Sequence, residues 1–537
     1  MGSNDDSEDE QLRYAIALSL QHHQPNADER DEVSKSNHSE LEDASSNSLL
    51  MNRKKMEEER LARLSAKRSR TTGEEDDVAD MSVPKRRMKL PTSQSPNHDH
   101  VLVPYPDGIV KRTWARGYDR SNDDIKIEEI LQRDKLLLAL FSSFQWDEPW
   151  LLGKIDLSRT KVILAAFAAN ESQKEAMRRN APDNIKFCFP EMRGPGSMHS
   201  KLQILKFPNY LRIVVPTGNL VPYDWGETGV MENMVFLIDL PLLNSANKSS
   251  TSTLFCTHLQ LYLRAMGVED GTITSLSKYD FTKTANLGFV YSIPGGHVNS
   301  SLSQIGFAGL GTTIAGLGLA TSKPIEVEYA CASLGAIKYD LVQSIYNACQ
   351  GTVEKDLLKR NQNAGSENEQ PVAPQLQQHF RIYFPSHKTV NSSRGGKNAA
   401  GTICLQEKWW HASTFPKELM RDCVNTRSGL LMHSKLILVH QTGNTAVDTS
   451  KKAAWAYVGS ANLSESAWGR VVRDKASGQQ KIICRNWECG VVVPARTASE
   501  QNSPIDMNIF KGTIPIPMQV PGRRYSQQEH PWFFQKT

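Results

Sequence analysis

A pentapeptide that carries a histidine and a lysine, MHSKL, occurs twice in this chain, at 198–202 and at 432–436. An apolar run follows each copy. After it comes a Thr/Ser-Gly/Ala-Asn-Leu string that contains Asn219 in the first case and Asn462 in the second. Both strings continue to a tryptophan six residues beyond the asparagine, followed by glycine. A repeat that extends over several blocks in the same order indicates an internal duplication, so two homologous halves of about 200 residues each are expected.

The apolar residues after each pentapeptide predict a β-strand. Side chains of a strand alternate between its two faces, so the histidine and the lysine of each copy share one face. These residues are His199 and Lys201 in the first copy and His433 and Lys435 in the second. Asn219 and Asn462 follow later apolar strands, at the carboxyl ends where open α/β sheets bind ligands. A pseudo-two-fold relation between the halves would bring all six side chains to one cleft.

This set of side chains suits the cleavage of a phosphodiester. Two ammonium groups and two carboxamides would hold the nonbridging oxygens and offset the charge that builds in the transition state. One imidazole would attack phosphorus while the other protonates the leaving oxygen, and the repeat alone does not say which does which. A carboxylate bonded to an imidazole fixes its tautomer, and Glu232 and Glu488 are the candidates. The motifs are not accompanied by carboxylate, histidine or cysteine clusters with metal-ligand spacing, so neither a metal ion nor another cofactor is expected.

Three further strings accompany the repeat: Ser-Leu-Gly-Ala at 333–336, Ser-Ala-Asn-Leu-Ser at 460–464 and His-Pro-Trp-Phe at 530–533. With them, residues 101–537 resemble the phospholipase D superfamily and, within it, most closely the tyrosyl-DNA phosphodiesterases. Phospholipases of that superfamily carry an aspartate five residues after the lysine, whereas this chain has Lys206 and His440 there. The missing aspartate and the downstream asparagines are typical of tyrosyl-DNA phosphodiesterases. Where some relatives have an aromatic residue before the first motif, this chain has Gly194-Pro195-Gly196.

The resemblance implies a role for each motif residue. His199 would be the nucleophile, and His433 would be the general acid that then acts as a base. The phosphate would be held by two lysines and two asparagines, Lys201, Lys435, Asn219 and Asn462. Glu488 would orient the nucleophile, and the partner of the second histidine would be Glu232, which the internal repeat favours, or Asn233. The residues expected to contact or flank the DNA strand are Ser333, Ser464 and Trp532.

The resemblance further implies a nuclear DNA-repair phosphodiesterase, expected to be a monomer, that hydrolyses the 3′-phosphotyrosyl bond of trapped topoisomerase I–DNA adducts and leaves a 3′-phosphate. One alternative is a lipid-cleaving phospholipase D or a nuclease on the same scaffold, and the missing aspartates count against the lipase. An alternative of another class is a catalytically silent adaptor between ubiquitin and DNA ends. The intact histidines and lysines of both halves count against that adaptor.

The expected fold is α/β, with two homologous α/β/α halves at 101–300 and 301–537 that meet in a pseudo-two-fold cleft, after a disordered arm at 1–100. The chain has 537 residues, and its net charge of only +4 argues against a uniformly basic nucleic-acid binder. Its eight cysteines form no Cys-x-x-Cys pair, which argues against a zinc ribbon and a secreted disulfide scaffold. Residues 284–322 lack charged side chains, but glycine and serine interrupt them, so no membrane segment is expected.

The arm is polar and poor in aromatic residues, which is the composition of disordered chains. At 8–21, an acidic run precedes Leu12, Ala15 and Ser19 at helical spacing, which predicts an amphipathic helix. This pattern resembles a ubiquitin-interacting motif, in which a small alanine lets the helix lie close against ubiquitin. The alternative is a helix that docks on the body of its own protein. Short basic clusters then suit nuclear import or tethering to nucleic acid, at 53–55, 67–70 and 84–89.

Overall fold

The computed structural model describes residues 103–243, 252–352, 372–441, 454–474, 477–495 and 507–534. The arm at 1–100 lies outside the described residues. The ubiquitin-binding residues Leu12, Ala15 and Ser19 and the basic clusters therefore stay predictions.

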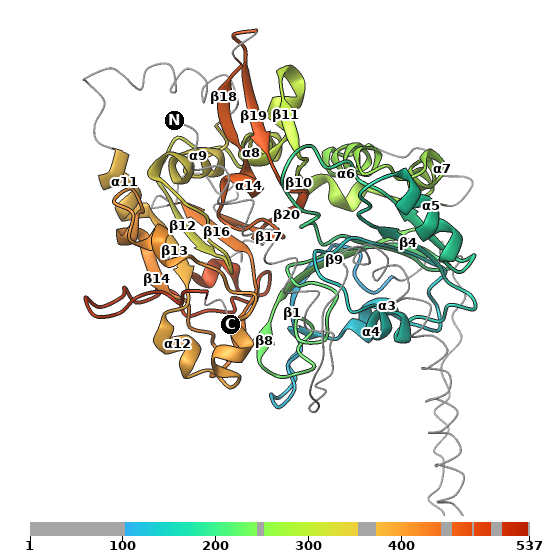
Figure 1. Ribbon diagram of the computed structural model, residues 1–537, viewed down its shortest axis with the longest axis horizontal. Helices are drawn as coiled ribbons and strands as arrows, with labels where there is room; N and C mark the ends of the chain where they lie inside the picture. Colours follow the sequence, from blue (N-terminus) through green and yellow to red (C-terminus); the bar gives the residue numbers. More distant parts are fainter. Residues whose placement is uncertain are drawn as a thin grey trace, which may run out of the picture. The chain divides into compact units, whose positions relative to one another are not determined.

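An eight-stranded sheet organises the first half (Figure 1). Along the sheet its strands are β2 (Asp124–Ile125), β1 (Ile109–Thr113), β9 (Met234–Pro241), β7 (Tyr210–Pro216), β6 (Gln203–Lys206), β3 (Leu138–Phe141), β4 (Lys161–Ala165) and β5 (Ile185–Cys188). Strands β3, β4 and β5 are parallel to one another, whereas β6, β7 and β9 pair antiparallel.

A seven-stranded sheet organises the second half. Along this sheet the strands are β10 (Gly288–Ser292), β20 (Glu488–Pro494), β17 (Ala454–Gly459), β16 (Leu436–Gln441), β12 (Ile325–Ala330), β13 (Phe380–Phe384) and β14 (Met420–Asp422). Strands β12, β13 and β14 are parallel, and β16, β17 and β20 pair antiparallel.

The two sheets share one strand order and one set of directions. The series β9-β7-β6-β3-β4-β5 of the first sheet corresponds strand by strand to the series β20-β17-β16-β12-β13-β14 of the second. The MHSKL motif immediately precedes β6 in one half and overlaps the start of β16 in the other. The duplication and the two-halved α/β fold expected from the sequence are therefore confirmed.

Helices cover both sheets. In the first half they are α3 (Ile127–Leu131), α4 (Glu148–Gly153) and α5 (Glu171–Asn180), and the following helices are α6 (Leu254–Ala265) and α7 (Asp270–Thr274). Figure 1 shows α5, α6 and α7 above the first sheet and α3 and α4 below it. The second half holds α8 (Gly306–Gly316), α9 (Tyr339–Cys349), α11 (Val372–His379), α12 (His387–Asn391), α13 (Glu407–Trp410) and α14 (Glu465–Trp468). Short 3₁₀ turns lie at Ser275–Lys278, Thr282–Asn286, Asn299–Gln304, Gly396–Ala400, Lys417–Leu419 and Met507–Phe510.

The first sheet is buried on both faces, as its continuous apolar strands predict. On one face Val214, Val235 and Leu237 join a cluster that includes residues of α3 and α4. On the other face Ile213 and Phe236 belong to a larger core that takes in α6 and most of the second half. One core therefore spans both halves, and it holds the ends of their central strands in fixed positions.

The halves are also joined by hydrogen bonds. Strand β8 (Met231–Glu232) of the first half pairs in parallel with β15 (Leu431–Met432) of the second. Strand β10, at Gly288–Ser292, already belongs to the second sheet, so the expected boundary at residue 300 is too late. The repeated motifs mark only the strands that the halves share, and β10 lies outside them.

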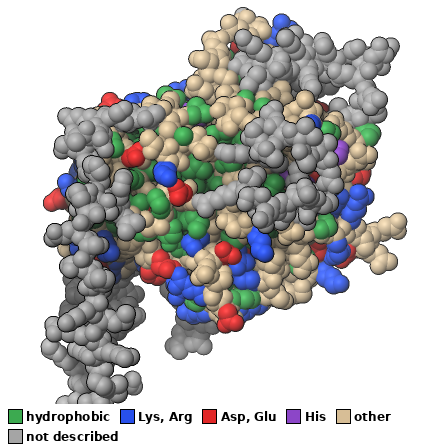
Figure 2. All heavy atoms as spheres, turned by 180° about the vertical axis from the view of Figure 1, so that it is seen from behind, with side chains coloured by type: hydrophobic (Ala, Val, Ile, Leu, Met, Phe, Trp, Pro, Cys, Tyr) green, Lys and Arg blue, Asp and Glu red, His purple; other side chains and the backbone are tan. Residues whose placement is uncertain are grey.

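A small third sheet contains β11 (Gly295–His297), β19 (Gln480–Cys484) and β18 (Arg470–Arg473), and it projects from the top of the molecule in Figure 1. Seen from behind, lysine and arginine side chains gather toward the lower part of the described surface (Figure 2). Within the described ranges, each helix falls short of the length and apolarity needed to cross a bilayer.

Candidate active site

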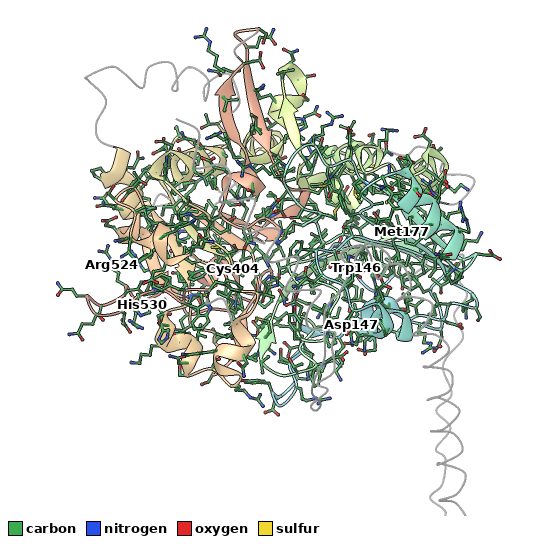
Figure 3. The ribbon with its side chains drawn as sticks, viewed as in Figure 1. Trp146, Asp147, Met177, Cys404, Arg524 and His530 are labelled. Atoms are coloured by element: carbon green, nitrogen blue, oxygen red, sulfur yellow. The ribbon has the colours of Figure 1, made fainter. Side chains whose placement is uncertain are left out.

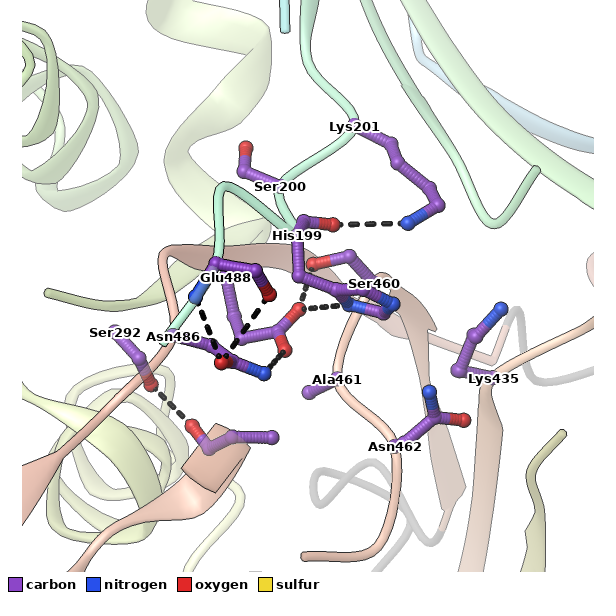
Figure 4. Close-up of polar contacts among 12 residues, drawn as sticks. His199, Ser200, Lys201, Ser292, Lys435, Ser460, Ala461, Asn462, Asn486 and Glu488 are labelled. Atoms are coloured by element: carbon purple, nitrogen blue, oxygen red, sulfur yellow. Dashed lines mark hydrogen bonds and ion pairs between the residues drawn. The ribbon is translucent and has the colours of Figure 1, made fainter. Parts of the chain in front are cut away.

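The first histidine is held by the second half of the chain. His199 lies in the extended segment before β6, and its backbone N–H donates to Trp487 O at 3.1 Å. Its Nδ1 lies 2.9 Å from Glu488 Oε2. Glu488, the first residue of β20, also accepts hydrogen bonds from the Ser460 hydroxyl and from Asn486 Nδ2, the latter at 3.1 Å (Figure 4). With Nδ1 bound to a fixed carboxylate, Nε2 is the nitrogen left for chemistry.

The second histidine is held by the first half. His433 Nδ1 lies 3.1 Å from Asp224 Oδ2, and its backbone N–H donates to Glu232 O at 3.0 Å. Asp224 is fully buried and accepts from the Asn219 N–H at 2.6 Å and from Asn233 Nδ2 at 3.1 Å. Each histidine therefore bonds a carboxylate that comes from the opposite half of the chain.

The expectation that Glu232 or Asn233 partners His433 is wrong, because Asp224 occupies that place. The Glu232 side chain instead forms a buried ion pair with the Arg427 guanidinium. The reason lies in the pairing of β8 with β15, which presents the backbone of Glu232 to His433 and turns its carboxylate toward the arginine.

The two lysines lie beside the histidines. Lys201 Nζ donates to His199 O at 2.9 Å, and Lys435 Nζ donates to His433 O at 2.6 Å. Figure 4 shows Lys201 above the His199 ring and Lys435 to its right, both toward the end of the ring that points away from Glu488. Both lysines are buried, and burial, together with the nearby charge of Lys201, holds the pKa of Lys435 well below its usual value. Two buried ammonium groups with few protein partners make a strong anion-binding site.

The two asparagines lie three residues beyond strands β7 and β17, as expected from the sequence. Asn462 Oδ1 accepts from the backbone N–H groups of Ala332 and Ser333, at 3.2 and 3.0 Å. Its amide NH₂ is therefore the end that can face an anion. Asn219 is held by Gln145, whose backbone N–H donates to Asn219 Oδ1 at 3.3 Å.

The electrostatics of the site favour neutral imidazoles. The pKa of His199 falls to about 4, because burial, together with the charges of Lys201 and Lys435, outweighs the opposing effect of Glu488. Burial likewise lowers the pKa of His433 to about 4, against the opposing effect of Asp224. The pKa of Lys201 falls to about 8 for the same reason. At neutral pH the site thus presents two uncharged imidazoles within a cationic field, which is suited to a phosphodiester anion.

The three residues expected to contact or flank the DNA strand have different surroundings. Ser333 lies next to the site, because its N–H bonds Asn462. Ser464 caps α14 by accepting from Ala467 N at 3.2 Å. Trp532 is only 4 % exposed and stacks on His387, with ring centroids 5.8 Å apart. The Trp532 ring therefore packs inside the protein, and a DNA strand cannot reach most of its surface.

Sequence reasoning missed three residues of the site. Asp224 orients His433, Gln145 holds Asn219, and the Phe144 ring lies 5.4 Å from that of His199. Asp224 precedes the repeated Trp-Gly pair, but the second half has Ala467 there, so a search for matching residues passes over it. Among the described residues, no group of three or more His, Cys, Asp and Glu side chains is arranged to hold a metal ion.

Comparison with known proteins agrees with this architecture. The family model of tyrosyl-DNA phosphodiesterase matches residues 109–526. Tyrosyl-DNA phosphodiesterase 1 of Arabidopsis thaliana is 21 % identical and covers 76 % of this chain and 71 % of its own. The Drosophila melanogaster protein of that name is 24 % identical, with 76 % and 70 % covered. In fold, the chain is similar to the crystal structure of yeast tyrosyl-DNA phosphodiesterase, with a TM-score of 0.57 at 17 % identity over 80 % of this chain and 100 % of the yeast chain.

The family model spans more than half of the chain, and its matched region contains both halves with their histidines, lysines and asparagines. The chain belongs to the tyrosyl-DNA phosphodiesterase family.

Proposed function

We propose that this protein hydrolyses the 3′-phosphotyrosyl bond between a topoisomerase I peptide and the 3′ end of DNA, and leaves a 3′-phosphate. The observation that carries the proposal is the pairing of two histidines, each bonded to a carboxylate of the opposite half, around two lysines and two asparagines. Membership of the family supports the choice of substrate.

In the first step, His199 Nε2 attacks phosphorus, and the bond from phosphorus to the tyrosine oxygen breaks. The pKa of His199, about 4, keeps the ring neutral and its Nε2 lone pair available near pH 7. Glu488 stabilises the imidazolium character that develops as the new bond forms. Lys201, Lys435, Asn219 and Asn462 would hold the nonbridging oxygens as charge builds on them. The bound phosphodiester anion offsets the lysine charges that lower the pKa of His433, so His433 takes up a proton when the substrate binds. The tyrosine then leaves as the phenol, with that proton supplied by His433.

In the second step, water attacks the phosphohistidine. His433, now neutral, accepts a proton from that water, and the bond from phosphorus to His199 breaks. Asp224 stabilises the His433 imidazolium that results. The released DNA strand carries a 3′-phosphate, and His433 is protonated again for the next leaving group.

The test is the cleavage of an oligonucleotide that carries a 3′-phosphotyrosyl group, in the presence of excess EDTA. We expect turnover to persist, because the lysines and asparagines of the site supply the positive field and the donors. Loss of activity on chelation that magnesium restores would contradict this mechanism. Cleavage of internal DNA linkages or of phosphatidylcholine at comparable rates would instead favour the nuclease or the lipase.

The arm extends the proposal beyond the active site. Its basic clusters suit nuclear import, and its amphipathic segment suits ubiquitin. A peptide of residues 1–30 should shift ubiquitin resonances, and Ala15→Gln with Ser19→Asp should abolish the shifts. Deletion of the arm should leave the turnover of a short oligonucleotide unchanged, and a tenfold fall would mean that the arm takes part in the site. The protein is expected to act as a monomer, because the described cleft takes both histidines from one chain.

A further inference from the structure

A second pocket lies in the C-terminal half, outside the histidine–lysine site. Its volume is about 420 Å³, and its lining residues are His387, Glu407, His411, His530 and Phe533. The lining thus consists of three imidazoles, one phenyl ring and one carboxylate.

The rings of this pocket are arranged as a stack. His530 and Phe533 are 5.0 Å apart at their centroids and inclined by only 5°. The His387 ring lies 5.1 Å from His530 on one side and stacks on the buried Trp532 on the other. The stack is fixed in place, because the N–H of His387 donates to His530 O at 3.1 Å.

A short path of paired backbone connects this pocket to the active site. Ser333, whose N–H bonds Asn462, pairs with Cys404. The next residue, Leu405, accepts a hydrogen bond from the backbone of Phe534 at 3.0 Å. Figure 3 shows Cys404 toward the middle of the molecule and His530 farther out on the same half. Neighbouring segments of the second half therefore join Asn462 of the active site to the wall of the pocket.

The glycine-rich loop before His199 offers no such ring. The loop before His199 has the sequence Gly194-Pro195-Gly196, and a Cβ at Gly196 would lie 1.8 Å from Arg485 O. Position 196 therefore admits only glycine, and an aromatic side chain cannot be placed there. A ring that stacks on a base of the bound strand therefore has to lie outside this loop.

We infer that the pocket lined by His387, Glu407, His411, His530 and Phe533 holds one nucleobase of the DNA strand, upstream of its 3′ end. Exposed bases of single strands stack on Phe and His rings, whatever their sequence. This inference rests on the proposed function, since it needs a DNA 3′ end in the active site.

The polar groups of the pocket favour a base over a backbone phosphate. Glu407 would repel a phosphate but can accept a hydrogen bond from the exocyclic amine of a base. Burial and the neighbouring His530 and Lys397 lower the pKa of His387, so its ring is neutral and aromatic rather than a cationic phosphate ligand. His411 and Glu407 are both about two-thirds exposed, at 63 and 67 %, and His411 Nε2 lies 3.6 Å from Glu407 Oε1 at the rim of the pocket.

The test compares single strands that all carry the same 3′-(4-nitrophenyl) phosphate. One series shortens a strand of about 14 nucleotides to a dinucleotide, and another places a single abasic unit at successive positions from the 3′ end. We expect wild-type kcat/KM to fall about fivefold to tenfold when one particular base is missing. His530→Ala should lower kcat/KM by a similar factor on the full strand, have no effect on the dinucleotide, and lose the response to the abasic unit.

Two controls make the result specific. His530→Phe keeps a ring face and should retain most of the wild-type response. Phe167→Ala removes an exposed ring of the first half that does not line the pocket, and it should change nothing. His411→Ala tests the exposed side of the pocket without disturbing the core and should lower kcat/KM on the full strand only. A response to peptide length at the 3′ end instead of DNA length would overturn the inference, as would equal losses on the dinucleotide and the full strand. If the wild-type protein cleaves no substrate of the series, the proposed function itself fails.

Discussion

Asn233 occupies in the first half the position that Glu488 occupies in the second. Thr217 Oγ1 donates to Asn233 Oδ1 at 2.8 Å, and the Ser460 hydroxyl donates to Glu488 in the same way. The adjacent backbone bonds correspond as well, from Thr217 N to Met234 O and from Ser460 N to Cys489 O. The internal symmetry thus places an amide where the second half has a carboxylate.

Asp224 restores the missing charge. It accepts a hydrogen bond from Asn233 Nδ2 at 3.1 Å and lies 3.1 Å from His433 Nδ1. Burial alone would raise the pKa of Asp224, but His433, Lys435 and the Asn219 N–H overcome that effect and hold the pKa below its usual value. Asp224 is therefore ionised at neutral pH and able to stabilise a protonated His433.

The first prediction follows from these two carboxylates. Asp224→Asn weakens His433 as an acid and base, so the hydrolysis of the covalent intermediate should slow by about 10²-fold or more. Glu488→Gln weakens the nucleophile His199, so the formation of the intermediate should slow instead. Rapid-quench measurement of both steps separates the variants. The assignment fails if both substitutions slow the same step.

The second prediction concerns Glu232 and Arg427. Arg427→Met leaves the carboxylate of Glu232 buried without its cation, and the loss of one partner from a buried pair costs about 3–5 kcal/mol. Urea denaturation should show this loss. Arg193→Met, which removes an exposed surface pair with Glu191, should change stability by less than about 1 kcal/mol. Glu232→Gln should lower stability but leave the kcat of the folded protein nearly unchanged. A large loss of kcat at unchanged stability would mean that Glu232 takes part in catalysis after all.

The sequence was sufficient for the parts of the site that repeat. His199 and His433 were found because two copies of one string mark them, and the strand order of the two sheets follows the same duplication. What breaks the symmetry was not predictable. Asp224 has no acidic counterpart in the second half, and its side chain reaches His433 only because the halves pack face to face. Strand β10 likewise could not be assigned to the second sheet in advance, because no repeated motif marks it.

The third prediction is the pH dependence of kcat/KM, which reports groups of the free enzyme. With a pKa of about 4, His199 loses its nucleophilic lone pair only in acid, so the acid limb should lie near pH 4 and not near the usual 6.5. With a pKa of about 8, Lys201 loses its charge in mild alkali, and burial holds the pKa of Lys435 well below its usual value too, so the rate should fall in that range. A 3′-(4-nitrophenyl) phosphate strand gives the profile, with circular dichroism to confirm folding at each pH. Lys201→Arg should move the alkaline limb upward because a guanidinium keeps its charge, and an unmoved limb would exclude Lys201 as its source.

The last prediction separates the two histidines. Each histidine bonds a carboxylate of the opposite half, so geometry alone does not name the nucleophile. His199 holds that role by its match to the family. If the role is right, His199→Ala should form no covalent protein–DNA adduct. His433→Asn should still form one, because tyrosine, with a phenol pKa near 10, can leave without much help from an acid. The adduct should then accumulate, because its hydrolysis needs a base to activate water. Denaturing gels of each variant with a labelled 3′-phosphotyrosyl strand, followed by peptide mapping, should place the phosphoryl group on His199. An adduct on His433 in the His199 variant, with none on His199 in the His433 variant, would exchange the two roles.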